Sequence, residues 1–159
     1  MKKLTVSFFG HRVLNNAFHV ERVLEKYVLK IISENEYVEF LVGREGDFDL
    51  LVAAVIRRCK KMTREDNSAL IWVMPYKTKD FEINEEEYGK YYDEIEICEE
   101  SSRSYFKSAH KIRNLFMIDR SDLIIFGVDH EYGGAYNAKV YAERQCKKVL
   151  NVYDGFDEI

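Results

Sequence analysis

The stretch GREGDFD, residues 43–49, decides the fold of this chain. An apolar run at 38–42 leads into it, as in a strand that is covered on both faces. Apolar residues then recur at the spacing of an amphipathic helix, at Phe48, Leu51, Val52, Val55, Ile56 and Cys59. The two glycines therefore stand where a strand turns into a helix. Free backbone N–H groups and the positive end of the helix dipole point out of such a turn, so we interpret it as one wall of a nucleotide-type site.

The same alternation of strands and helices continues along the chain. Further strands are expected at 4–9, 69–74, 123–128 and 149–152, and helices at 17–31, 48–59, 101–117 and from Gly133 onward. Asn15 or Asn16 is expected to cap the first helix. This order predicts an α/β fold of the Rossmann-like, doubly wound type, with a mostly parallel sheet and helices on both faces. We expect residues 1–159 to form a single domain.

One segment, about 77–100, differs from the rest because it is strongly acidic and carries tyrosines among its carboxylates. A surface helical turn is expected around 85–92, and a short strand near 94–98. We interpret the segment as insertion-like. A solvated face is favoured there over an interaction surface.

Composition limits the class of protein. At 159 residues the chain is long enough for a full core, and its net charge of −4 argues against a nucleic-acid partner. Three widely spaced cysteines without a CxxC pair fit a reducing cytoplasm and argue against a disulfide framework or a zinc site. Neither a membrane-length apolar run nor a signal-peptide pattern is present, so we expect a cytoplasmic protein with no membrane partner.

Three polar or glycine-rich turns follow expected strand ends, at 10–12, 43–49 and 129–137. In a doubly wound sheet these turns share one edge, at which ligands bind near the point where the strand order reverses. Candidate ligand-binding residues come from these turns and from the helix before the fifth strand. They are Gly10, His11, Arg12, Gly43, Arg44, Gly46, Asp47, Asp49, Asn114, Gly133, Gly134, Ala135 and Asn137.

The candidates differ in the chemistry that they suit. Arg12 can fork onto a phosphate or form a surface salt bridge, and His11 is either a ligand contact or a turn residue. Glu45, Asp47 and Asp49 would repel a phosphate and fit ribose hydroxyls or a metal ion better. Asp47 is expected as the cap of the second helix. The glycines at 133–134 open a helix and are the better phosphate seat.

The motifs of these turns, taken in order, resemble those of the SLOG superfamily, which joins DprA-type and LOG-type Rossmann-like proteins. The resemblance rests on an ordered set of motifs: FFGHR (8–12), the glycine turn 43–49, RN (113–114), SDLII (121–125), GG (133–134) and YA (141–142). It covers nearly the whole chain apart from the acidic segment. It implies a nucleotide-binding fold, and small-molecule nucleotides or their derivatives as ligands. It also implies a dimer or larger homo-oligomer by analogy.

Some members of the superfamily cleave the N-glycosidic bond of nucleoside 5′-monophosphates with a glutamate and an upstream arginine. Here Ala138 stands in the place of that glutamate and Ala135 in the place of a threonine, while Arg113 matches the arginine. Loss of the acid/base residue favours binding over turnover. The alternative is a nucleotide N-glycosidase or other hydrolase that uses Arg113 with Glu45.

Two further alternatives have less support in the sequence. One is a metal-dependent phosphohydrolase built on His11 and the acidic residues of the second turn, and the other is a DprA-like role on single-stranded DNA. No cofactor is certain. Mg²⁺ is considered only as a companion of the nucleotide, and no residue is assigned as a metal ligand.

Overall fold

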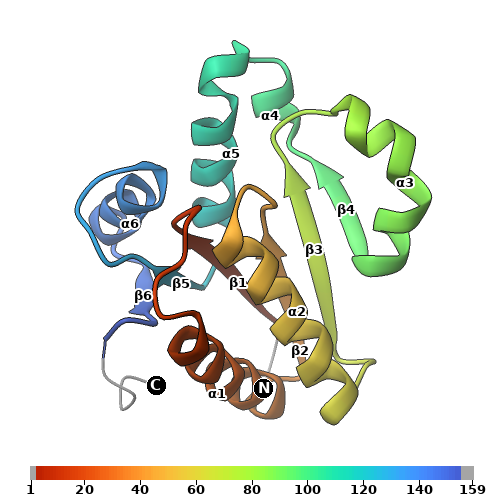
Figure 1. Cartoon of the computed structure of the whole chain (residues 1–159), viewed down its shortest axis with the longest axis vertical. Coiled ribbons are helices and arrows are strands. Elements are labelled where there is room, and N and C mark those ends of the chain that lie inside the picture. Colours follow the sequence, from red (N-terminus) through yellow and green to blue (C-terminus); the bar gives the residue numbers. More distant parts are fainter. Residues whose placement is uncertain (1–2, 155–159) are drawn as a thin grey trace.

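The computed structural model describes residues 3–154, in which strands and helices alternate (Figure 1). Residues 1–2 and 155–159 of the expected domain lie outside the described residues. The elements are β1 (Lys3–Gly10), α1 (Ala17–Glu34), β2 (Tyr37–Val42), α2 (Asp47–Met62), β3 (Ser68–Met74), α3 (Lys79–Tyr91), β4 (Glu94–Ile97), α4 (Glu99–Ser102), α5 (Phe106–Arg120), β5 (Leu123–Gly127), α6 (Gly134–Arg144) and β6 (Lys148–Asn151).

The six strands form one sheet in the order β4-β3-β2-β1-β5-β6, and every neighbouring pair is parallel. The α/β, Rossmann-like fold class expected from the sequence is therefore confirmed. Strand order runs one way from β1 to β4 and the other way from β5 to β6. The switch point lies between β1 and β5, where such sheets open a crevice at their carboxyl ends.

Helices cover both faces of the sheet. Successive residues of a strand point to opposite faces, so each strand contributes to two cores. In β2, Phe40 packs into a core with residues of α1 and α2. The next residue, Leu41, packs into a second core with Met117 of α5 and Ala142 of α6. Figure 1 shows α2 lying in front of the sheet. The central strands are buried on both faces, which explains their nearly continuous apolar sequence.

The helix expected at 101–117 is divided in the structure into α4 and α5. Serine side chains explain the break, since hydroxyls that bond to nearby carbonyls compete with helical hydrogen bonds. Ser101 Oγ donates to Cys98 O at 3.1 Å, and Ser104 Oγ donates to Ser101 O at 2.7 Å. Tyr105, at the cap position of α5, and Phe106, its first residue, are 57% and 63% exposed.

The acidic segment is built into the sheet. Its expected helical turn is a longer helix, α3, which begins where Thr78 Oγ1 accepts the Phe81 N–H at 3.1 Å. Its expected strand is β4, the edge strand beside β3. Phe81 and Tyr88 contact the ring of Trp72 in β3, at centroid distances of 5.8 and 5.0 Å. Between residues 3 and 154, no helix combines the length and the apolar character that a membrane crossing requires.

Candidate functional site

A cleft of about 490 Å³ opens at the carboxyl edge of the sheet. Its walls come from the loops after β1, β2 and β5, the three turns expected to converge, and from α5. The cleft gathers most of the candidate residues: Gly10, His11, Arg12, Glu45, Gly46, Asp49, Arg113, Asn114, Gly133, Gly134 and Ala135. His110, His130 and Tyr132 also line it and were not among the candidates.

Glycines in and beside the cleft allow close packing within the protein. A Cβ on Gly10 would lie 2.2 Å from the Phe48 ring, and one on Gly127 would lie 2.4 Å from it. Phe48 thus fills the space between the ends of β1 and β5. A Cβ on Gly46 would lie 2.4 Å from Arg12 Cα, and the Asp47 N–H donates to Arg12 O at 2.8 Å. These contacts hold the first two loops together.

Arg113 is 3% exposed and holds Glu45 in position. Its Nη2 donates to Glu45 Oε1 at 2.5 Å and its Nη1 to Glu45 Oε2 at 3.4 Å. The remaining donors reach Val73 O at 2.8 Å and Asn114 Oδ1 at 3.0 Å. The two residues expected to act in catalysis therefore form an ion pair between a buried guanidinium and a partly exposed carboxylate. Arg113 directs its guanidinium at protein acceptors.

Two carboxyl groups in the cleft have unlike acidities. Burial acts to raise the pKa of Glu45, but the Arg113 charge and its hydrogen bonds outweigh burial and lower that pKa. Asp49 is 9% exposed, and its Oδ2 accepts the Glu45 N–H at 3.0 Å. Burial and the neighbouring Glu45 charge raise the pKa of Asp49 to about 7. Carboxyl pairs whose environments separate their acidities are suited to acid/base chemistry.

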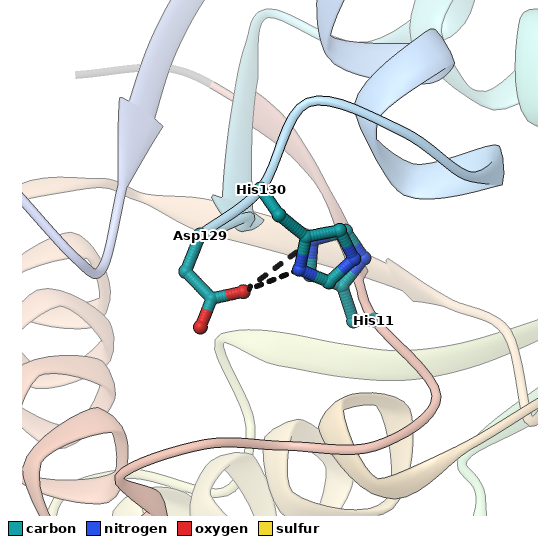
Figure 2. Close-up of side chains that lie close together, drawn as sticks. All are labelled: His11, Asp129 and His130. Atoms are coloured by element: carbon teal, nitrogen blue, oxygen red, sulfur yellow. Dashed lines mark hydrogen bonds and ion pairs between the residues drawn. The ribbon is translucent and has the colours of Figure 1, made fainter.

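Three side chains meet across the switch point, as Figure 2 shows. The rings of His11 and His130 stack with centroids 3.5 Å apart and planes 9° apart. Asp129 Oδ1 lies 2.8 Å from His130 Nδ1 and 3.7 Å from His11 Nε2. Burial and the nearby His130 lower the pKa of His11, so its imidazole is neutral at pH 7. Tyr132 packs on His130 with its ring tilted by 34° and the ring centroids 4.1 Å apart.

Neither His130 nor Asp129 was expected to have a role in the site. They follow β5, and His11 follows β1, so the three residues meet because these strands are neighbours. The sequence feature that could have indicated these two residues was a histidine and an aspartate directly after an apolar strand. Asn15 also serves this cluster, because its Nδ2 donates to Asp129 Oδ2 at 2.9 Å. Asn16 occupies the cap position of α1, but its side chain makes no cap hydrogen bond there with any described residue.

The N-terminus of α6 forms another wall of the cleft. Gly133 stands at the cap position with φ of 95° and ψ of 173°, and none of the described side chains caps this end. The first N–H groups of a helix have no intrahelical acceptor, and Gly134 and Ala135, the first residues of α6, line the cleft. Arg12 adds a positive charge on the opposite loop.

The remaining candidates lie outside the cleft. Arg44 points into an aromatic cluster, with its guanidinium 4.9 Å from the Tyr88 ring and 3.0 Å from Tyr92 Oη. Asp47 is the first residue of α2 and not its cap, which is Gly46, and its Oδ2 accepts the Leu14 N–H at 3.3 Å. Gly43 packs beneath Glu45 and Asp49, where a Cβ would meet their oxygens. Asn137 lines a neighbouring groove.

Comparison with models of protein families finds no match for this sequence, and no curated protein matches it. Solved structures do match. DNA processing protein A from Helicobacter pylori, described by a single-stranded DNA binding mode, aligns with a TM-score of 0.65 and 13% identity over 93% of this chain and 64% of that one. DNA processing protein A (DprA) from Streptococcus pneumoniae aligns with a TM-score of 0.64 and 14% identity over 98% and 53%. The chain shares the Rossmann-like fold of these two proteins and spans 64% and 53% of their length.

The exclusion of a nucleic-acid partner is corrected by this comparison. It rested on the net charge of −4, yet the H. pylori neighbour with this fold is described by its binding of single-stranded DNA. Net charge averages the whole surface, whereas binding depends on the local field. Residues of α5 and α6 that are far apart in sequence assemble a groove of about 860 Å³ with basic and aromatic members, among them Lys107, Lys111, Arg144, Tyr136 and Tyr141.

Proposed function

We propose that this protein binds a phosphate-bearing, nucleotide-type ligand in the cleft at the carboxyl edge of the sheet. The observation that carries the proposal is the convergence of three strand-end loops on one cleft at the switch point. Its volume of about 490 Å³ falls within the usual range for small-molecule sites. Such crevices are the usual ligand sites of doubly wound sheets.

The walls of the cleft suit the two ends of a nucleotide. The uncapped first turn of α6 and the Arg12 guanidinium offer donors and positive charge to a phosphate. Glu45 and Asp49 also line the cleft, and their oxygens suit ribose hydroxyls. Arg113 supports this arrangement indirectly, by fixing the Glu45 carboxylate.

The test is isothermal titration and thermal shift of the purified chain with AMP, ADP, ATP, GMP and ADP-ribose, with and without Mg²⁺. Adenosine serves as the ligand control because it lacks the phosphate. A ligand at 100 times its dissociation constant stabilises the protein by about 2.7 kcal/mol. Adenosine is expected to bind at least about tenfold more weakly than the best phosphorylated ligand.

Arg12→Ala is expected to weaken that binding by at least about tenfold, because a charge-assisted contact is removed. The matched control is Arg64→Ala. Arg64 lies on the loop between α2 and β3, at the other edge of the sheet, and pairs with Asp66 at 3.1 Å. Equal affinity for AMP and adenosine, or equal loss in both variants, would contradict a phosphate seat in the cleft.

The same nucleotide chemistry is carried by the end of a single-stranded DNA chain. Titration with an oligothymidylate distinguishes a free nucleotide from the end of a DNA strand as the ligand. Lys111→Ala alters the α5–α6 groove and not the cleft, so it should weaken oligonucleotide binding and leave AMP binding unchanged. Binding of AMP but not of the oligonucleotide would assign the cleft to free nucleotides.

Hydrolysis of an N-glycosidic bond is the second candidate function. The observation that favours it is the pair of unlike carboxyl groups, with the pKa of Asp49 near 7 beside an ionised Glu45. Ala138 lies on the buried face of α6 and lines the neighbouring groove, so the carboxyl groups would come from the second loop. Chromatography of nucleoside monophosphates incubated with the protein tests for free base. Asp49→Asn should abolish its release.

A further inference from the structure

The cluster of His11, Asp129 and His130 has an arrangement that nucleotide binding does not require. Their donor atoms, one from each residue, all lie within 4.8 Å of one another. His11 is 9% exposed, and no described residue gives its Nε2 a hydrogen bond. That nitrogen is aimed at the Asp129 carboxylate, 3.7 Å away (Figure 2). A buried polar atom without a partner is costly, which calls for an explanation.

We propose that His11, Asp129 and His130 form a site for a divalent transition-metal ion, with Nε2, a carboxylate oxygen and Nδ1 as the ligands. An ion bound there would give His11 Nε2 the partner that it lacks. It would also lie between two nitrogens and a carboxylate that already face one another. Three protein ligands leave coordination positions open, and both histidines line the cleft, so these positions face a bound ligand.

The hydrogen bonds around the cluster support this assignment. Metal-binding carboxylates are commonly held by a further hydrogen bond. Here Asn15 Nδ2 donates to Asp129 Oδ2 at 2.9 Å, which leaves Oδ1 directed at the two imidazoles. The backbone N–H of His11 donates to Gly127 O at 3.3 Å and fixes the first ligand beside β5.

Binding requires one movement, in His130. Imidazole nitrogens bind metals in the plane of the ring, and the two rings are now parallel at 3.5 Å. His130 lies on the loop after β5 and its side chain is 31% exposed, so it can tilt while the more buried His11 stays in place. We therefore expect the ion to unstack the rings.

The donor set selects among ions. Two imidazoles and a carboxylate suit Zn²⁺, Co²⁺, Ni²⁺ or Fe²⁺, whereas Mg²⁺ prefers oxygen ligands. The sequence argument against zinc considered cysteine spacing, and none of these three ligands is a cysteine. The ion site is thus distinct from the Mg²⁺ that could accompany a nucleotide.

The test uses the full chain, stripped with a chelator, and needs no nucleotide. Titration with Zn²⁺ by calorimetry should show one saturable site, and Co²⁺ should give visible absorption bands on binding. His130→Ala and Asp129→Asn are each expected to weaken Zn²⁺ binding by at least about tenfold and to remove the Co²⁺ bands. His19→Gln is the matched control, since it removes a histidine of α1 and should leave both signals unchanged.

Thermal denaturation of the stripped variants checks that they are folded. His130 and Asp129 stand on a loop, so their replacement should leave the core intact. Equal Zn²⁺ affinity in all four proteins would overturn the proposal, as would the absence of saturable binding to the unmutated chain. Because no nucleotide is present, either outcome leaves the nucleotide test unaffected.

Discussion

Asp49 and Glu45 show how much the surroundings of one residue determine its chemistry. Both are carboxylic acids on one turn, and Arg113 contacts Glu45 through two hydrogen bonds while Asp49 receives a backbone N–H. Their pKa values move in opposite directions as a result. A sequence indicates two acids at a strand-to-helix turn. It does not indicate which of them a distant arginine will reach.

The raised pKa of Asp49 predicts a particular dependence of stability on pH. The native protein keeps this proton up to about pH 7, whereas the unfolded chain releases it near 3.8. Between these values the native state binds more protons, so the free energy of unfolding falls as pH rises. From pH 5 to pH 8, the loss due to this group is about 2–3 kcal/mol.

Asp49→Asn should therefore flatten the pH profile, because asparagine can accept the same N–H without titrating. Urea denaturation of both proteins at pH 5 and pH 8 measures the effect, and other titrating groups cancel in the comparison. Parallel profiles would show that Asp49 is ionised in the native protein.

At the scale of single elements, the start of α6 is set by backbone geometry. Gly133 has φ of 95° with ψ of 173°, a region that is essentially restricted to glycine. Gly134, the next residue, is helical, and a Cβ on either glycine would meet no described atom within 4 Å. Backbone strain and not crowding thus distinguishes the two positions.

This difference predicts unequal effects of the same substitution. Gly133→Ala should lower the free energy of unfolding by about 1–3 kcal/mol, because alanine is strained at positive φ. Gly134→Ala should be neutral or stabilising by up to about 1 kcal/mol, since alanine favours the helix. Urea midpoints measure both. Equal destabilisation by the two changes would contradict the geometry at Gly133.

Elements were predictable where one local pattern dominated. The stripe of α1, Val20 to Ile31, is buried as its spacing predicts, because a single apolar face meets the sheet. The same reasoning failed at 101–117, where serine hydroxyls bond to carbonyls three residues earlier and end α4. The prediction that Arg44 lines the ligand site was wrong for a different reason. Its aromatic partners, Tyr88 and Tyr92, are far along the chain and meet it through the pairing of β3 with β2.

For the whole molecule, the alternation of strands and helices predicts a parallel sheet, but the order of the strands depends on long-range packing. The cleft follows from that order, since β1 and β5 become neighbours only at the switch point. The convergence of the three loops was therefore predictable from the fold class. The meeting of His11 with His130 required the register of two strands that are far apart in sequence.

The sheet order also predicts how stability is distributed. The strands β1, β2, β3 and β5 each have neighbours on both sides, whereas β4 pairs with β3 alone among the described strands. All residues of β3 and β5 are buried, and none of the residues of β4 is fully buried. Opening of an edge with few buried contacts costs less than global unfolding. Amides of β4 should therefore exchange with deuterium much faster than those of β1.

A tether from α5 makes this prediction specific. Arg120 Nη1 donates to Glu96 Oε2 at 2.6 Å and so links α5 to β4. Both side chains are about one-third exposed, so the pair contributes about 0.5–1 kcal/mol. Arg120→Gln should raise the exchange rates of β4 amides by about two- to fivefold and leave those of β1 unchanged, as measured by NMR. If β4 and β1 exchanged at equal rates in both proteins, the acidic segment would unfold only with the whole sheet.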